Sequence, residues 1–155
     1  PLPWCALATT GRVGTSLFQS LLDSHPEIFV FNGELFFADF WQRSVVVAHG
    51  GEIDAGVLTH EFIGLHLKSL HSQYDFAENK AALGKDKNQS VTINTETFLE
   101  YVVGLHRSRP VTSRSFLQSV YVAYALCLGQ DIARKKIFVH RDDMMIAHLH
   151  TIVPN

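Results

Sequence analysis

The sequence predicts an α/β fold in three layers, with a central parallel sheet covered by helices on both faces. Short apolar segments at residues 4–8, 28–31 and 136–140 suit buried strands, and segments with helical periodicity separate them. Such an alternation is typical of a parallel sheet with helical cover. With 155 residues, of which 46% are hydrophobic, the chain can build one domain around one core.

The first strand leads through a glycine turn into a helix. Gly11 and Gly14 permit the positive φ and the close backbone approach that a tight turn requires. Thr15 and Ser16 suit a helix N-terminus and carry hydroxyl groups. The helix ends before Pro26, because the residue that precedes a proline leaves the α region. Its apolar face consists of Leu17, Phe18, Leu21 and Leu22.

Capping residues and periodicity define the remaining elements. Residues 72–90 are polar and aperiodic and indicate a surface excursion, and residues 107–114 form a basic loop. Helices are predicted over 35–49 (closed by Gly50 and Gly51), 54–71 (N-cap Asp54), 97–106 (a capping box from Thr97), 116–128 (C-cap Gly129) and from Asp142 onward.

The turn before the first helix is a candidate anion site. Unsatisfied backbone N–H groups and the helix dipole both favour negative charge at such a point. A nucleotide-kinase loop would read G-x-x-x-x-G-K-[ST], but Thr15 stands at the lysine position and the cation is Arg12, inside the turn. An arginine can bond two oxygens of a tetrahedral anion at once. The predicted anion-binding residues are Thr10, Gly11, Arg12, Val13, Gly14, Thr15 and Ser16.

Residues 11–28 resemble the 5′-phosphosulfate loop of the sulfotransferases. That loop typically reads R/K-S-G-T-T-L-L and is followed by a helix that ends in D/S-H-P-x-I. The run from His25 to Ile28 matches the end of the motif, and Val13 replaces its usual serine. The residues that match its beginning are Arg12, Gly14, Thr15, Ser16 and Leu17.

A second segment, residues 136–142, resembles the family's strand that ends in R-D-P. Arg141 and Asp142 match this motif, whereas Asp143 replaces the proline. Leu149 stands where the family usually has a serine, eight residues after the arginine. Residues 40–110 match no motif of the family.

The resemblance implies a P-loop NTPase-like fold and an enzyme that uses 3′-phosphoadenosine 5′-phosphosulfate (PAPS) as donor. Such an enzyme moves the sulfuryl group to an acceptor hydroxyl or amine, for example on a carbohydrate. The resemblance implies that the loop holds the 5′-phosphosulfate, that Arg12 stabilises the developing charge, and that Arg141 binds the 3′-phosphate. Glu34 follows the second strand at the spacing of the family's acceptor base. No metal is expected, since the leaving group is already a stabilised phosphate.

Two other classes of protein stay open. One is a P-loop kinase that uses ATP and magnesium, against which the missing loop lysine argues. The other is a degenerate nucleotide-binding module, which the three departures at Val13, Asp143 and Leu149 favour. Glu34 can also be read as an acid at a helix N-terminus, and Arg141 as a surface ion-pair residue. Arg114, in the basic loop, is read as a solvated arginine.

Composition excludes several partners. The net charge of −2 gives no basic field for nucleic acid, and no apolar run reaches the ~18 residues that span a membrane. The nine histidines lack the spacing of a metal site. Cys5 and Cys127 are predicted to be packed thiols and not a disulfide. The aromatic residues Phe36, Phe37, Phe40 and Trp41 are predicted to form core and pocket wall, and not a stacking platform for bases.

The resemblance also bears on location and completeness. Bacterial relatives are cytoplasmic, which is the expectation here, whereas the eukaryotic carbohydrate enzymes are anchored in the Golgi. Relatives are usually longer, so the chain is expected to be a fragment that lacks the C-terminal part of the domain. The sequence does not indicate the acceptor or the oligomeric state.

Overall fold

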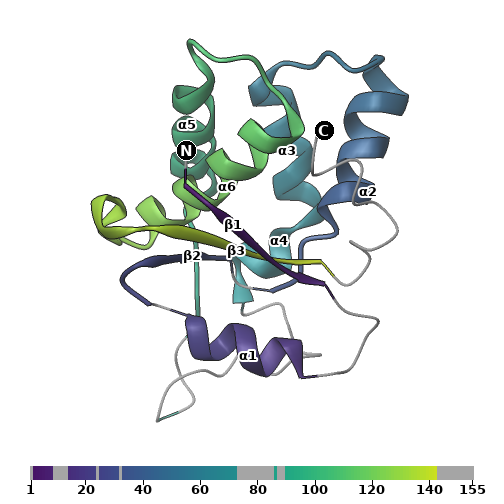
Figure 1. Ribbon diagram of the computed structural model, residues 1–155. Coiled ribbons are helices and arrows are strands. Elements are labelled where there is room, and N and C mark those ends of the chain that lie inside the picture. The colour runs from purple at the N-terminus through teal and green to yellow at the C-terminus, as the bar shows by residue number, and fades with distance from the viewer. Residues whose placement is uncertain are drawn as a thin grey trace.

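The computed structural model describes residues 2–8, 14–23, 25–31, 33–72, 86 and 90–142. They form a mixed α/β fold with a small open sheet of three parallel strands, β1 (Trp4–Ala8), β2 (Ile28–Val30) and β3 (Ile137–Asp142) (Figure 1). The strand order is β1-β3-β2, so β3 pairs with both of the others. The three predicted strands and their parallel direction are therefore confirmed.

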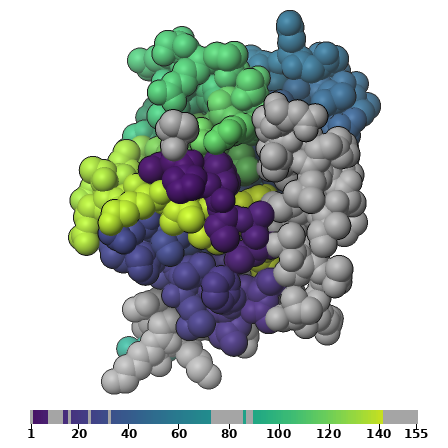
Figure 2. All heavy atoms as spheres, viewed as in Figure 1, coloured from purple at the N-terminus to yellow at the C-terminus, as the bar shows by residue number. Residues whose placement is uncertain are grey.

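The strand β1 lies at one edge of this sheet. Cys5 and Ala6 are exposed, while Trp4 and Leu7 are half-buried, and Figure 2 shows β1 at the molecular surface beside β3. Among the described strands, β1 pairs with β3 alone. The prediction that β1 is buried is wrong, because an apolar sequence does not determine which strand occupies the sheet edge.

Helices connect the strands. In Figure 1, α3, α5 and α6 lie on one side of the sheet and α1 lies on the other. Within the described part of the chain, no helix is both long enough and apolar enough to cross a membrane. The helices are α1 (Thr15–Leu22), α2 (Phe37–Trp41), the π-helix η1 (Gln42–Val47), α3 (Ala55–Leu65), α4 (Leu67–Leu70), α5 (Thr95–His106), α6 (Ser113–Cys127) and the short 3₁₀ helix η3 (Ile132–Arg134).

Side-chain caps set where the helices begin. Asp54 caps α3 as predicted, by accepting hydrogen bonds from two backbone N–H groups. The predicted capping box at Thr97 is wrong, because the side chain of Asn94 caps α5 one turn earlier. The helix α6 also begins earlier than predicted, since Thr112 and Ser115 cap it reciprocally within the predicted basic loop.

Two predicted helices are less regular than their sequences suggest. The helix predicted over 35–49 begins at Phe37 and contains the π-helical segment η1, and it ends as predicted where Gly50 and Gly51 have φ of 64° and 99°. The helix predicted over 54–71 is interrupted at His66, which has φ −108° and ψ 22°. At this break the His66 ring stacks on Phe62, with 4.2 Å between ring centroids. The surface excursion predicted over 72–90 and the terminal helix lie mostly outside the described residues.

Aromatic side chains form the core between the sheet and the helices. Phe29 and Phe138 stack with ring centroids 4.5 Å apart, and Phe31 lies 4.5 Å from Tyr124 of α6. The predicted core role is confirmed for three of the four aromatic residues, which are buried: Phe37, Phe40 and Trp41. It is wrong for Phe36, which is 45% exposed.

A buried histidine extends this core toward the end of β3. His140 is 1% exposed, and its Nδ1 lies 3.0 Å from the Tyr121 hydroxyl oxygen. Burial lowers the pKa of His140 from 6.5 to about 4. The ring is therefore neutral at neutral pH and packs as part of the core.

Two adjacent lysines connect β3 to the start of β2 in different ways. Lys135 is 6% exposed, and its Nζ donates hydrogen bonds to the carbonyl oxygens of His25 (3.0 Å) and Ile28 (2.8 Å). Lys136 forms a surface ion pair with Glu27. The buried lysine thus donates to two backbone carbonyls at the entry to β2, whereas the exposed lysine pairs with a solvated carboxylate.

Both cysteines are free thiols, as predicted. Cys127 is half-buried, and burial raises the pKa of its thiol to about 11. Cys5 is exposed on the edge strand, so the prediction that it is packed is wrong for the same reason that β1 is not buried.

Candidate functional site

The carboxyl ends of β1 and β3 bring the two predicted binding segments together. Leu7 pairs with Arg141, and Ala8 pairs with Asp142. The chain therefore leaves β1 toward the predicted anion loop directly beside Arg141. In open parallel sheets, ligands bind at this end of the strands.

The far end of the predicted anion loop has the expected backbone geometry. Gly14 is the N-cap of α1 with φ 86° and ψ 12°, a left-handed conformation that favours glycine. Thr15 is the first residue of α1 and Ser16 the second, as predicted. No side chain caps this helix terminus. Four of the predicted loop residues lie outside the described residues: Thr10, Gly11, Arg12 and Val13.

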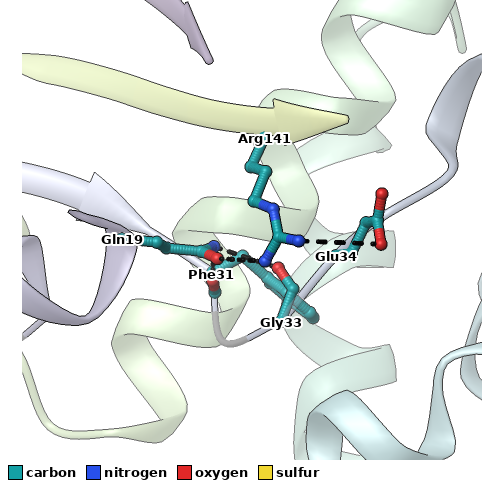
Figure 3. Close-up of polar contacts among 5 residues, drawn as sticks. All are labelled: Gln19, Phe31, Gly33, Glu34 and Arg141. Carbon is teal, nitrogen blue, oxygen red and sulfur yellow. Dashed lines mark hydrogen bonds and ion pairs between the residues drawn. The ribbon is translucent and has the colours of Figure 1, made fainter. Parts of the chain in front are cut away.

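Arg141 and Glu34 lie close together below the end of β3 (Figure 3). The Arg141 Nη2 atom is 3.9 Å from a Glu34 carboxylate oxygen, a separation that makes an ion pair but exceeds hydrogen-bond length. The Arg141 side chain is 5% exposed and that of Glu34 is 19% exposed. The structure thus brings together two predicted site residues that are far apart in the sequence, and Glu34 keeps limited access to solvent.

Gln19 of α1 is a member of this cluster that the sequence did not reveal. Its Nε2 donates hydrogen bonds to the carbonyl oxygens of Phe31 (2.6 Å) and Gly33 (3.0 Å), and its Oε1 lies 3.4 Å from Arg141 Nη1. The side chain therefore holds the segment that leads from β2 to Glu34, and it also contacts the arginine (Figure 3). The available signal was the single amide in a helix whose other residues are leucine, phenylalanine, serine and threonine.

The orientation of α1 explains why Gln19 is buried. Most of the predicted apolar face of this helix lies outward: Leu17 is 68% exposed, Phe18 is 49% exposed and Leu21 is 72% exposed, while Leu22 is half-buried. Gln19, by contrast, is 6% exposed. Periodicity identified an apolar face of α1. The side chain that faces the protein is instead the Gln19 amide, which donates hydrogen bonds to the carbonyl oxygens of Phe31 and Gly33 after β2. The face that α1 turns inward is thus set by hydrogen bonding to the backbone between β2 and Glu34.

The burial of Arg141 determines what its charge does. An arginine stays protonated, and a buried charge is costly unless an opposite charge and hydrogen-bond acceptors surround it. Glu34 supplies the opposite charge and Gln19 supplies an acceptor. In the described conformation the guanidinium therefore points to these partners and not to bulk water.

Other candidates take no part in this cluster. Arg114 is exposed as predicted, although it lies in the first turn of α6 and not in a loop. His60 is exposed, while His66 is buried against Phe62, so these two histidines do not converge. Over the described ranges, no group of three or more His, Cys, Asp or Glu residues is placed to hold a metal ion.

Comparison of the chain with protein-family models, with curated proteins and with solved structures finds no match.

Proposed function

We propose that this chain is a sulfotransferase domain with a three-layer, P-loop NTPase-like fold. In this proposal it binds PAPS and transfers the sulfuryl group to an acceptor hydroxyl or amine. The donor's 5′-phosphosulfate lies in the loop from Thr10 to Ser16, and the acceptor is a small molecule or a carbohydrate. The proposal rests on the motif in the first loop together with the structural neighbourhood of that loop.

One observation carries the proposal. The loop begins beside Arg141, since Leu7 and Arg141 are register partners, and Arg141 lies 3.9 Å from Glu34. The strand that leads into the proposed anion-binding turn, a cation and a carboxylate thus lie together at the carboxyl end of a parallel sheet, although they come from three separate segments. This is the combination that sulfuryl transfer needs, namely charge stabilisation for the donor and a base for the acceptor.

The proposed reaction is an in-line displacement at sulfur. The acceptor oxygen or nitrogen forms a new bond to the sulfur atom, while the bond from sulfur to the bridging phosphate oxygen breaks. Glu34 accepts the proton that the acceptor loses, and 3′-phosphoadenosine 5′-phosphate departs with the electron pair of the broken bond. Arg12 stabilises the negative charge that develops on the bridging oxygen.

Two contacts that Arg141 makes within the described residues are long, which favours a phosphate-binding role for this side chain. Its contact with Gln19 is 3.4 Å long, beyond the usual 2.7–3.2 Å of such bonds, so losing it costs little free energy. The contact with Glu34 is an ion pair without a direct hydrogen bond. A 3′-phosphate would bring a stronger acceptor to the same guanidinium, because arginine bonds phosphate oxygens in pairs.

The burial of Arg141 also favours a second candidate, a nucleotide-binding module without transferase activity. With 5% of its side chain exposed, Arg141 already neutralises the carboxylate that would act as base. A module in which these two groups serve only the fold would bind a nucleotide through the loop alone. It would therefore tolerate the loss of Arg141 in binding assays.

A thermal-shift titration with 3′-phosphoadenosine 5′-phosphate tests the proposal, with ATP and magnesium titrated in parallel. A ligand at 100 times its dissociation constant adds about 2.7 kcal/mol to the free energy of unfolding. We expect stabilisation by the 3′-phosphorylated nucleotide alone, and its loss in Arg12→Ala and Arg141→Ala. Arg114→Ala is the matched control, because this arginine is exposed and outside the cluster.

Other results of the titration would assign the protein to a different class. Stabilisation by ATP and magnesium alone would indicate a kinase. Stabilisation that persists in Arg141→Ala, without sulfuryl transfer to any acceptor, would indicate the non-catalytic module. Where transfer is observed, Glu34→Gln should abolish turnover and keep the affinity for the donor, and an unchanged rate would exclude Glu34 as the base.

A further inference from the structure

A cavity of about 250 Å³ lies at the opposite end of the sheet from the cluster of Arg141, Glu34 and Gln19. Its walls come from the segment before β1, the first residues of β2 and β3, the helices α5 and α6, and η3. Phe138, near the start of β3, lines it, whereas Arg141 stands near the end of the same strand. The cavity is therefore separate from the proposed donor site.

More than half of the residues that line the cavity are apolar. Phe29 and Phe138, whose ring centroids lie 4.5 Å apart, are two of them, and the others come from the segment before β1 and from α5, α6 and η3. An apolar cavity of 150 Å³ is large enough for benzene, so this one accommodates a ring with a short substituent. The apolar lining consists of Leu2, Phe29, Leu105, Val122, Ile132 and Phe138.

Two polar residues of the lining have no side-chain partner among the described residues. They are Arg109, which is exposed, and Gln118, which is half-buried, and neither makes an ion pair or a side-chain hydrogen bond to any described residue. None of the described residues that line the cavity is acidic. The cavity thus combines one positive charge and one amide donor with an apolar surface.

A histidine and a serine that also line the cavity are already paired with each other. His106 Nε2 lies 3.0 Å from Ser119 Oγ, and the Ser119 hydroxyl donates to the Phe116 carbonyl oxygen at 2.8 Å. Because that proton is committed to the backbone, His106 is the donor in the pair and does not activate the serine as a nucleophile. Burial lowers the pKa of His106, so the ring is neutral near pH 7 and Arg109 is the cation of the cavity.

We propose that this cavity binds a small aromatic carboxylate. The ring lies against Phe29, Phe138 and Val122, and the carboxylate accepts hydrogen bonds from Arg109 and Gln118. A carboxylate matches a single guanidinium bidentately, and the amide adds a neutral donor. A phosphate would find only one cation here and would leave most of its charge unpaired. The inference does not depend on the proposed transferase activity, since it concerns the other end of the sheet.

Phenylacetate is a suitable probe, with phenylacetamide as its uncharged counterpart and acetate as the version without a ring. Binding of each compound to the full chain is measured by two-dimensional amide NMR and by isothermal titration calorimetry. We expect phenylacetate to shift resonances around the cavity and to bind more tightly than either counterpart. In Arg109→Gln its dissociation constant should rise about fivefold, which corresponds to the ~1 kcal/mol of an exposed ion pair.

Two variants separate this interpretation from a general charge effect or from misfolding. Arg107→Gln removes an exposed arginine two residues away that does not line the cavity, and it should leave the affinity unchanged. Val122→Phe places a larger side chain in the apolar lining of the cavity. It should abolish binding of phenylacetate while the rest of the amide spectrum stays native. Equal weakening by both arginine variants, shifts confined to the carboxyl ends of the strands, or no shifts at millimolar phenylacetate would overturn the proposal.

Discussion

Replacing Gln19 by methionine tests whether one amide holds the candidate site together. The substitution keeps the length of the side chain and removes its hydrogen bonds to the carbonyl oxygens of Phe31 (2.6 Å) and Gly33 (3.0 Å). It also removes the acceptor that faces Arg141. Gln19 is 6% exposed, so water does not readily replace these partners.

The magnitude follows from the number of hydrogen bonds lost. Each neutral side-chain hydrogen bond contributes about 0.5–1.5 kcal/mol, and a buried acceptor that is left unpaired adds to the cost. We therefore expect Gln19→Met to lower the free energy of unfolding by about 2–3 kcal/mol. For a domain of this size, such a change corresponds to a fall in Tm of roughly 5–10 °C.

Urea denaturation of Gln19→Met, followed by circular dichroism, measures this change. The control is Gln42→Met, because Gln42 is exposed on η1 and surface substitutions usually change stability by at most about 0.5 kcal/mol. If the two variants lose the same small amount of stability, the hydrogen bonds of Gln19 do not hold the segment between β2 and Glu34. That result would also remove the structural reason for the outward apolar face of α1.

Two further predictions concern His140 in β3 and Lys135 in the segment that leads into β3. His140 has a pKa near 4 in the folded state against 6.5 when unfolded, so the unfolded chain binds more protons below pH 6.5. The free energy of unfolding should therefore fall by about 3 kcal/mol as the pH drops from 6.5 to about 4. Urea denaturation at several pH values measures this dependence. With decreasing pH, the free energy of unfolding should fall less in His140→Asn than in the unchanged protein, whereas the exposed control His60→Asn should behave like the unchanged protein. Lys135→Met should cost about 2 kcal/mol, because two backbone carbonyls lose a charged donor, whereas the neighbouring Lys136→Met should cost at most about 0.5 kcal/mol; equal losses in thermal unfolding would contradict this difference.

Local chemistry made the strands and some helix boundaries predictable. The strand β1, the turn at Gly14 and the N-cap at Asp54 each depend on a few adjacent residues, and the structure confirms them. The start of α5 was missed because two capping patterns stand one turn apart, and Asn94 was chosen over Thr97. Where two local signals compete, the sequence alone does not determine which one the tertiary structure selects.

The arrangement of the candidate site was predictable only in part. A parallel sheet brings the carboxyl ends of its strands to one edge. The sequence therefore predicted that the end of β1, which leads into the first loop, lies near Arg141 at the end of β3. The contact between Arg141 and Glu34 was not anticipated, because each residue was assigned a separate ligand. Gln19 was missed since a helix with exposed Leu17 and Leu21 reverses the usual relation between apolar periodicity and burial.

The contact between Arg141 and Glu34 has a consequence for the proposed chemistry. While the guanidinium lies 3.9 Å from the carboxylate, the two side chains form an ion pair. A donor phosphate bound to Arg141 would compete with Glu34 for the guanidinium, because arginine bonds phosphate oxygens in pairs. In the proposed enzyme, donor binding would thus release Glu34 from this ion pair so that it can contact the acceptor. The same contact in a chain that never binds a phosphorylated nucleotide would leave a permanently neutralised carboxylate, so the dependence of turnover on both Arg141 and Glu34 distinguishes an active site from a buried ion pair that serves the fold.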